Sequence, residues 1–280
     1  MRTSFSSSPS LPAEARLMKE ETIFINNLKV NYKMAGVGPA ILVLHGWGGS
    51  SGSWLSVQEV LAKKGYRVIV LDFPGFGKSI TPPSPWGIND YVEWLKKFIE
   101  GIRKTCEELV EPFFLIGHSF GGRIAIKFTT QYPEKIKSLI LCDSAGIKPK
   151  PGLKTIIIFW LARIGNAIFT PKHLQRFKDS ARNLFYIFLR NKDYVKANGT
   201  MKETIKKVLD EDLLEDLSKI KTKTLIVWGK ADKMVPLKYA YIFKEKIANS
   251  ELEILPKIGH SPHLEVPEKL AEIILKFIKE

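Results

Sequence analysis

The chain has 280 residues, of which 45% are hydrophobic, enough to bury the core of one large α/β domain or of two ordinary ones. Its formal charge is +14, but the basic residues are mostly lysines spread along the chain, without the Arg-rich runs or basic–aromatic interleaving of nucleic-acid-binding segments. No stretch reaches the roughly 20 nearly uncharged apolar residues of a membrane span, so we expect a soluble protein without nucleic-acid partners or stable membrane insertion.

The N-terminus and the two cysteines carry little chemistry. Residues 1–17 are rich in Ser and Pro and lack the apolar core of a secretory signal, so we interpret them as a disordered leader. Cys106 and Cys142 lie near no His and near no other Cys, so no metal or redox motif appears. We therefore expect a cytoplasmic protein that needs no metal and no cofactor.

The first predicted elements form a hairpin. Residues 21–25 (ETIFI) and 28–36 (LKVNYKMAG) read as strands, and the Asn26-Asn27 pair between them is a turn signal.

Beyond the hairpin, apolar runs alternate with stretches of helical periodicity. The runs predict buried strands over residues 40–46, 66–72, 113–119 and 136–144, and the periodic stretches predict helices over 53–65, 88–102 and 121–133. Continuous Val/Ile/Leu runs are typical of parallel strands that helices cover on both faces. The pattern predicts a doubly wound α/β fold.

The alternation stops after the fourth of these runs. From residue 147 to residue 218 the segments are helix-like with no strand between them, and strands resume at 223–229 and 251–256, with helices at 236–248 and 265–279. We therefore expect one core domain, residues 18–146 and 219–280, interrupted by a helical cap formed by residues 147–218.

A serine between glycines is the first candidate for chemistry. Residues 117–121 read Gly-His-Ser-Phe-Gly, directly after a predicted strand and at the start of a predicted helix. This is the pattern of a nucleophile elbow, in which a sharp turn exposes the serine hydroxyl and leaves room only for glycines on either side. Ser119 is the predicted nucleophile.

A serine alcohol needs a base, and the base needs an orienting carboxylate. Of the five histidines, His260 lies in a Gly-His turn after the last strand and is our candidate, while His118, His45 and His263 read as structural and His173 falls in the cap without local support.

The predicted acid is Asp232, in the loop after the strand at 223–229, with Asp143, after the strand at 136–144, as the alternative. The order Ser119, Asp232, His260 is that of enzymes with this elbow.

An oxyanion hole requires two backbone N–H donors. The expected donors are the N–H of Phe120, which follows the nucleophile, and that of Trp47 in the loop HGWGG. Because only main-chain groups are used, the side chains of Trp47 and Phe120 are candidates for lining the substrate pocket, as are Phe159 and Trp160 in the apolar first segment of the cap.

Together these motifs make the chain resemble the α/β-hydrolase superfamily. The resemblance covers residues 20 to 280 and rests on HGWGG, DFPGFGKS, GHSFGG, WGKADKMVP and GHSPHLEVPE, in that order. It implies a mostly parallel eight-stranded sheet with helices on both faces and a helical cap inserted after the sixth strand. Ser119 argues against the haloalkane dehalogenases and epoxide hydrolases of this superfamily, which use Asp at the elbow.

The resemblance implies three functions. The leading one is a carboxylesterase that cleaves a small hydrophobic acyl ester through an acyl-enzyme. The second is a hydrolase of carbon–carbon bonds in aromatic ring-cleavage products, for which Arg123, Arg163 and Arg190 are candidate carboxylate-binding residues. The third is a small-molecule receptor of the same fold with slow turnover. The oligomeric state is left open.

Overall fold

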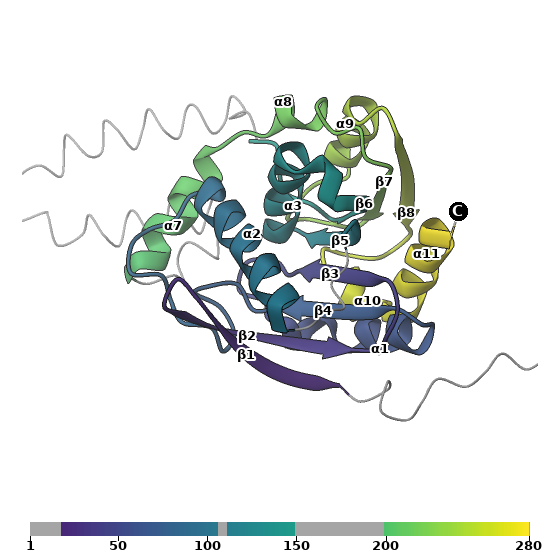
Figure 1. Cartoon of the computed structure of the whole chain (residues 1–280). Coiled ribbons are helices and arrows are strands. Elements are labelled where there is room, and N and C mark those ends of the chain that lie inside the picture. The colour runs from purple at the N-terminus through teal and green to yellow at the C-terminus, as the bar shows by residue number, and fades with distance from the viewer. Residues whose placement is uncertain (1–17, 106–110, 149–198, 280) are drawn as a thin grey trace, which may run out of the picture.

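The computed structural model describes residues 18–105, 111–148 and 199–279 (Figure 1). Its centre is one eight-stranded sheet in the order β1-β2-β4-β3-β5-β6-β7-β8. The pairs β1–β2 and β2–β4 are antiparallel and all other pairs are parallel. The strands are β1 Lys19–Ile25, β2 Leu28–Ala35, β3 Ala40–Leu44, β4 Arg67–Leu71, β5 Phe113–His118, β6 Ile136–Cys142, β7 Thr224–Gly229 and β8 Ser250–Leu255. The mostly parallel sheet that the sequence predicts is confirmed.

The hairpin joining β1 and β2 is explained by its two asparagines. Asn26 and Asn27 both have positive φ, 50° and 63°, as the central residues of a type I′ turn require. Asparagine tolerates this backbone region better than other residues with a side chain, so the turn fixes the antiparallel register in which Ile25 pairs with Leu28.

Helices cover both faces of the sheet, as expected. They are η2 Ser51–Trp54, α1 Leu55–Lys63, α2 Ile88–Thr105, α3 Phe120–Gln131, η3 Pro133–Lys135, α7 Gly199–Asp210, α8 Leu214–Leu217, α9 Lys238–Lys246, α10 Pro262–Glu265 and α11 Pro267–Lys279. The periodicity did not predict the short helices η3 and α10, because three or four residues are too few to show a helical repeat.

The central strands are apolar along their whole length because each face has its own hydrophobic layer. In β3, Leu42 and Leu44 join the cluster beneath α2, α3 and α9, whereas Ile41 and Val43 join the cluster beneath α1 and α11. All four side chains are at most 1% exposed. The continuous apolar run thus corresponds to a strand buried on both sides.

Two described helices, α7 and α8, lie between β6 and β7 in the chain. The Thr204 hydroxyl in α7 accepts a hydrogen bond from the Trp86 N–H (3.1 Å), and the Lys207 ammonium donates to the Pro85 carbonyl (2.8 Å). These contacts hold α7 against the loop that leads into α2. The rest of the expected cap, residues 149–198, lies outside the described residues, as does the expected leader, residues 1–17. Among the described residues no helix combines the length and the apolar character of a membrane span.

Candidate active site

The Gly-His-Ser-Phe-Gly segment forms a sharp turn between β5 and α3. Ser119 has φ 50° and ψ −112°, a conformation that costs energy for a residue with a side chain. Three backbone hydrogen bonds hold it there, from the Ser119 N–H to the Cys142 carbonyl and to the Ser119 carbonyl from the Gly122 and Ala145 N–H groups. The turn therefore holds the serine at the carboxyl end of the central strand.

The flanking glycines are required by close backbone approach. A Cβ on Gly121 would lie 2.2 Å from the Leu44 carbonyl oxygen, and one on Gly117 would lie 2.8 Å from the Gly121 carbonyl oxygen. Any larger residue would push α3 away from β3 and β5. The spacing that the sequence shows is thus a packing requirement of the elbow.

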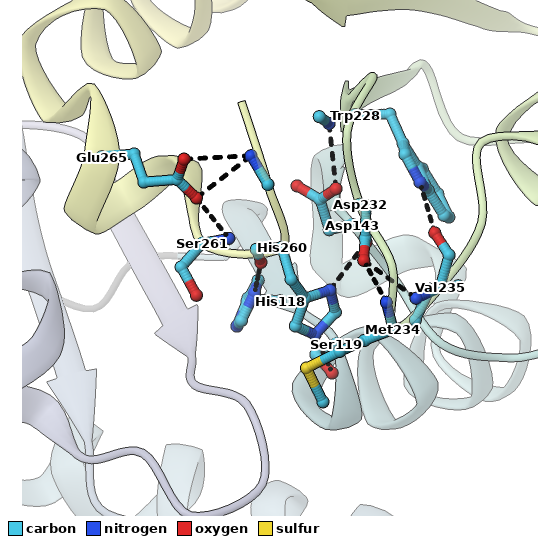
Figure 2. Close-up of polar contacts among 12 residues, drawn as sticks. His118, Ser119, Asp143, Trp228, Asp232, Met234, Val235, His260, Ser261 and Glu265 are labelled. Atoms are coloured by element: carbon cyan, nitrogen blue, oxygen red, sulfur yellow. Dashed lines mark hydrogen bonds and ion pairs between the residues drawn. The ribbon is translucent and has the colours of Figure 1, made fainter. Parts of the chain in front are cut away.

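Three side chains from distant parts of the sequence form one chain of hydrogen bonds (Figure 2). His260 Nε2 lies 2.9 Å from Ser119 Oγ, and His260 Nδ1 lies 2.7 Å from Asp232 Oδ2. Because a carboxylate only accepts, Nδ1 carries the proton and Nε2 is left to accept from the serine hydroxyl. This arrangement can remove a proton from Ser119.

Asp232 is held by its own loop. Its Oδ1 accepts hydrogen bonds from the backbone N–H groups of Met234 (2.7 Å) and Val235 (3.0 Å), while Oδ2 accepts from His260. The carboxylate is fully buried and the imidazole is 12% exposed. Three donors therefore compensate the charge of a carboxylate that water does not reach.

The loop carrying His260 is fixed from both sides, as Figure 2 shows. The Glu265 carboxylate in α10 accepts from the Gly259 N–H (3.0 and 3.1 Å to its two oxygens) and from the Ser261 N–H (3.3 Å). His118 Nε2 donates to the His260 carbonyl over 2.7 Å. The backbone is thus anchored at Gly259 and at the peptide unit that joins His260 to Ser261, independently of the imidazole itself.

The other described histidines, His45, His118 and His263, are buried. Burial, together with the neighbouring His263 and His260, lowers the pKa of His118 well below its usual value, and burial lowers the pKa of His263 to about 4. The His263 ring stacks on Trp54 with a 4.6 Å centroid separation. Both rings are therefore neutral at pH 7; His118 serves as a hydrogen-bond donor to the backbone, and His263 packs on Trp54.

His45 orders the loop that holds Trp47. Its Nδ1 donates to the Gly46 carbonyl (2.8 Å), and its Nε2 accepts the Phe73 N–H (3.0 Å), so one neutral tautomer satisfies both contacts. Burial lowers its pKa in agreement with this state.

The predicted oxyanion residues lie beside each other. The rings of Trp47 and Phe120 are 5.3 Å apart and nearly perpendicular. Phe120 begins α3, so its N–H is one of those that an α-helix leaves without an internal partner. Its ring is 3% exposed and packs on Phe73 and Tyr91, whereas Trp47 is half-buried. Of these two rings, Trp47 presents the more accessible surface.

The apolar side chain of Met234 is not among the site residues that the sequence predicts. It is 62% exposed, and in Figure 2 it extends toward Ser119. Its position two residues after the predicted acid was the available signal. The predicted pocket residues Phe159 and Trp160 lie outside the described residues, as do His173, Arg163 and Arg190.

Arg123, the remaining candidate for binding a carboxylate, is 3% exposed and donates from Nη1 to the Glu211 carbonyl (2.9 Å). Burial lowers its pKa to about 10, which leaves it charged at pH 7. This contact joins α3 to the segment between α7 and α8.

Comparisons with known proteins agree with this geometry. A family profile described as the alpha/beta hydrolase fold matches residues 39–267. The chain is 29% identical to the 2-hydroxy-6-oxo-6-(2'-aminophenyl)hexa-2,4-dienoic acid hydrolase of Metapseudomonas resinovorans, over 91% of this chain and 90% of that protein. It is 28% identical to the monoacylglycerol lipase ABHD6 of Mus musculus, over 87% of this chain and 76% of that protein.

Solved structures of other proteins share this fold. A serine hydrolase involved in carbazole degradation superimposes with a TM-score of 0.69 at 26% identity, over 94% of this chain and 99% of that one. A bromoperoxidase from Bacillus anthracis superimposes with a TM-score of 0.72 at 22% identity, over 94% of this chain and 100% of that one, and shows the shared fold.

Proposed function

Because the chain belongs to the α/β-hydrolase fold family, we propose that it is a serine hydrolase that cleaves carboxylic esters through an acyl-enzyme. The observation that carries the proposal is the continuous hydrogen-bonded path from Ser119 through His260 to Asp232. A nucleophile, a base and an orienting acid in this geometry are the minimum that acyl transfer requires.

In the first half of the proposed reaction, Ser119 Oγ attacks the ester carbonyl while His260 Nε2 takes its proton. The buried Asp232 carboxylate stabilises the imidazolium that results. The backbone N–H groups of Trp47 and Phe120 donate hydrogen bonds to the negatively charged tetrahedral oxygen and stabilise it. In enzymes of this kind, one such donor contributes about 10²–10³-fold in kcat.

In the second half, His260 gives its proton to the departing alcohol and the acyl group stays on Ser119. The same imidazole then removes a proton from water, which attacks the acyl-enzyme and releases the acid. The hydrogen bonds at Gly259, at Ser261 and at the His260 carbonyl keep the ring within reach of both groups.

The proposed substrate is a small hydrophobic acyl ester. Apolar surface comes from the half-buried Trp47, whose ring packs on Phe120 next to Ser119, and from the exposed Met234, which extends toward Ser119 in Figure 2. We also propose that residues 147–218 form a cap over this site, with Phe159 and Trp160 contributing to the pocket. The similarity to a monoacylglycerol lipase supports an ester substrate.

A second candidate function is carbon–carbon bond hydrolysis of aromatic ring-cleavage products, which the similarity to the dienoic acid hydrolase of Metapseudomonas resinovorans favours. These substrates carry carboxylates and would need a cation at the site. The Arg123 guanidinium donates to a backbone carbonyl of the chain itself, so this candidate rests on Arg163 or Arg190 in the cap.

A substrate panel separates these functions. p-Nitrophenyl esters of graded acyl length, a monoacylglycerol and a vinylogous keto-acid from ring cleavage are assayed with the wild type and with Ser119→Ala. Hydrolysis of the esters and the monoacylglycerol that is lost in Ser119→Ala supports the proposal. Preferential turnover of the keto-acid selects the second candidate.

Two results would contradict the ester proposal. One is full esterase activity in Ser119→Ala, which would show that Ser119 is not the nucleophile. The other is a negligible rate on every compound with saturable binding of one of them, which would instead favour a receptor of this fold.

A further inference from the structure

A second buried carboxyl group lies beside the Asp232 carboxylate. Asp143 follows β6, and its side chain is fully buried. One ligand atom each from Asp143, Asp232 and His260 lie within 4.8 Å of one another, and Figure 2 shows the two carboxyl groups adjacent. Asp143 is therefore part of the same polar cluster, although His260 bonds to Asp232.

The two carboxyl groups receive unequal numbers of donors. Asp232 accepts from two backbone N–H groups and from the imidazole. Asp143 accepts one hydrogen bond at Oδ1, from the Gly229 N–H (2.9 Å), and its Oδ2 has no donor among the described residues. Two adjacent buried carboxylates cannot both stay ionised at low cost, and the proton binds to the one with fewer donors.

We propose that the Asp143 carboxyl group is protonated at Oδ2 at neutral pH and donates a hydrogen bond from this O–H to the Asp232 carboxylate. Asp143 thereby positions the acid of the site. The proposal rests on the function proposed above. It accounts for both oxygens of Asp143, because Oδ1 accepts from Gly229 and a protonated Oδ2 becomes a donor. Asp143 touches neither Ser119 nor a substrate in this scheme, so it is a positioning residue.

Burial and the neighbouring negative charges also favour the protonated form of Asp143. Burial raises its pKa to about 9, and the negative charges of Asp232 and Glu265 contribute to the increase, whereas the Gly229 N–H opposes it. Its other titratable neighbours are the Cys142 thiol, whose pKa burial raises well above its usual value, and the His260 imidazole. A neutral Asp143 leaves a single negative charge to stabilise the imidazolium.

The backbone allows a clean isosteric test. Asp143 has φ 42°, a region that asparagine also tolerates. Asp143→Asn keeps an acceptor for Gly229 and an N–H donor for Asp232, and it carries no proton to lose. Asp143→Ala removes both groups, and Asp232→Asn removes the acid itself.

The expected activities follow from this chemistry. Asp143→Asn keeps kcat/KM for a p-nitrophenyl ester within about threefold of wild type, while Asp143→Ala lowers it about tenfold, the effect of one lost buried hydrogen bond. Asp232→Asn lowers kcat by about 10⁴-fold, as in enzymes with this arrangement of groups. Above pH 9 the wild-type rate falls as Asp143 ionises, and Asp143→Asn lacks this decrease.

An infrared spectrum tests the proton directly and does not depend on activity. At pH 7 the wild type shows the carbonyl band of a buried neutral carboxylic acid, and the band is absent from Asp143→Asn. A purely structural role for Asp143 would not produce this band.

Either of two results overturns the proposal. One is a spectrum without that band, and the other is an Asp143→Asn variant as inactive as Asp232→Asn, which would make Asp143 an ionised partner of the base. Ser119→Ala is assayed in parallel, because activity in that variant would refute the proposed function and would leave the infrared result valid.

Discussion

The anchoring of the His260 loop by Glu265 gives a quantitative prediction. Replacing Glu265 with alanine removes the acceptor for the Gly259 and Ser261 N–H groups and leaves the three residues of the hydrogen-bonded path unchanged. The imidazole then loses one of the two supports of its peptide. Glu265→Gln keeps the shape and one acceptor oxygen, and therefore restores most of the support without the charge.

The size of the effect follows from the contacts. A hydrogen bond to a charged group contributes about 1.5–3 kcal/mol when buried, but the Glu265 side chain is exposed and water replaces it in part. We therefore assign roughly 1–2 kcal/mol to the pair of N–H contacts. If this appears as misplacement of the base, kcat falls about 5- to 30-fold, since 1.36 kcal/mol corresponds to a factor of ten.

The assay is the pH dependence of kcat and of kcat/KM on a p-nitrophenyl ester, together with a thermal melt of each variant. Glu268→Ala is the matched control. Glu268 is also exposed and lies three residues after Glu265, in the first turn of α11, but the hydrogen bonds to Gly259 and Ser261 are made by Glu265. We expect a lower kcat in Glu265→Ala, partial recovery in Glu265→Gln and no change in Glu268→Ala. An unchanged kcat in Glu265→Ala would refute this reasoning.

Three further predictions concern stability and specificity. Burial lowers the pKa of His263 to about 4 in the folded protein, against about 6.5 in the unfolded chain, so the unfolded chain binds the extra proton and the free energy of unfolding decreases as the pH falls from 6.5 to 4. His263→Phe lacks this proton, so acidification should lower its free energy of unfolding by up to about 3 kcal/mol less than that of wild type, measured by urea unfolding. Gly121→Ala should lower the melting temperature by roughly 5 °C or more, because the new Cβ meets the Leu44 carbonyl; an unshifted melt would contradict the packing argument. Met234→Ala should raise KM for the longer acyl esters more than for acetate and should leave kcat for acetate unchanged; a uniform change along the ester series would show that Met234 does not contact the acyl chain.

Much of the sheet was predictable because its periodicities are simple. The strand over residues 40–46 has an unbroken apolar pattern, and in the structure Leu42 and Leu44 face one helical layer while Ile41 and Val43 face the other. The elbow was predictable because the close approach of Gly121 to the Leu44 backbone excludes every larger residue, so a glycine is required at this position of the sequence.

The contacts that support the site were less accessible to sequence reasoning. No local pattern distinguishes Glu265 from other acidic residues, because its role depends on how α10 folds back on the Gly259 N–H. From the sequence, Asp143 is only the alternative to Asp232. Which of the two accepts from His260 depends on where the loop after β7 places its N–H groups, and no local pattern specifies that.

The most direct test of the central claim is to trap the nucleophile covalently. The protein is treated with a fluorophosphonate, and the modified peptide is identified by mass spectrometry, with the labelling rate measured for wild type and for His260→Ala. The hydrogen-bonded path from Ser119 to Asp232 predicts a single adduct on Ser119 that forms far more slowly without the imidazole. An adduct on another residue, or equal labelling rates in the two proteins, would contradict it.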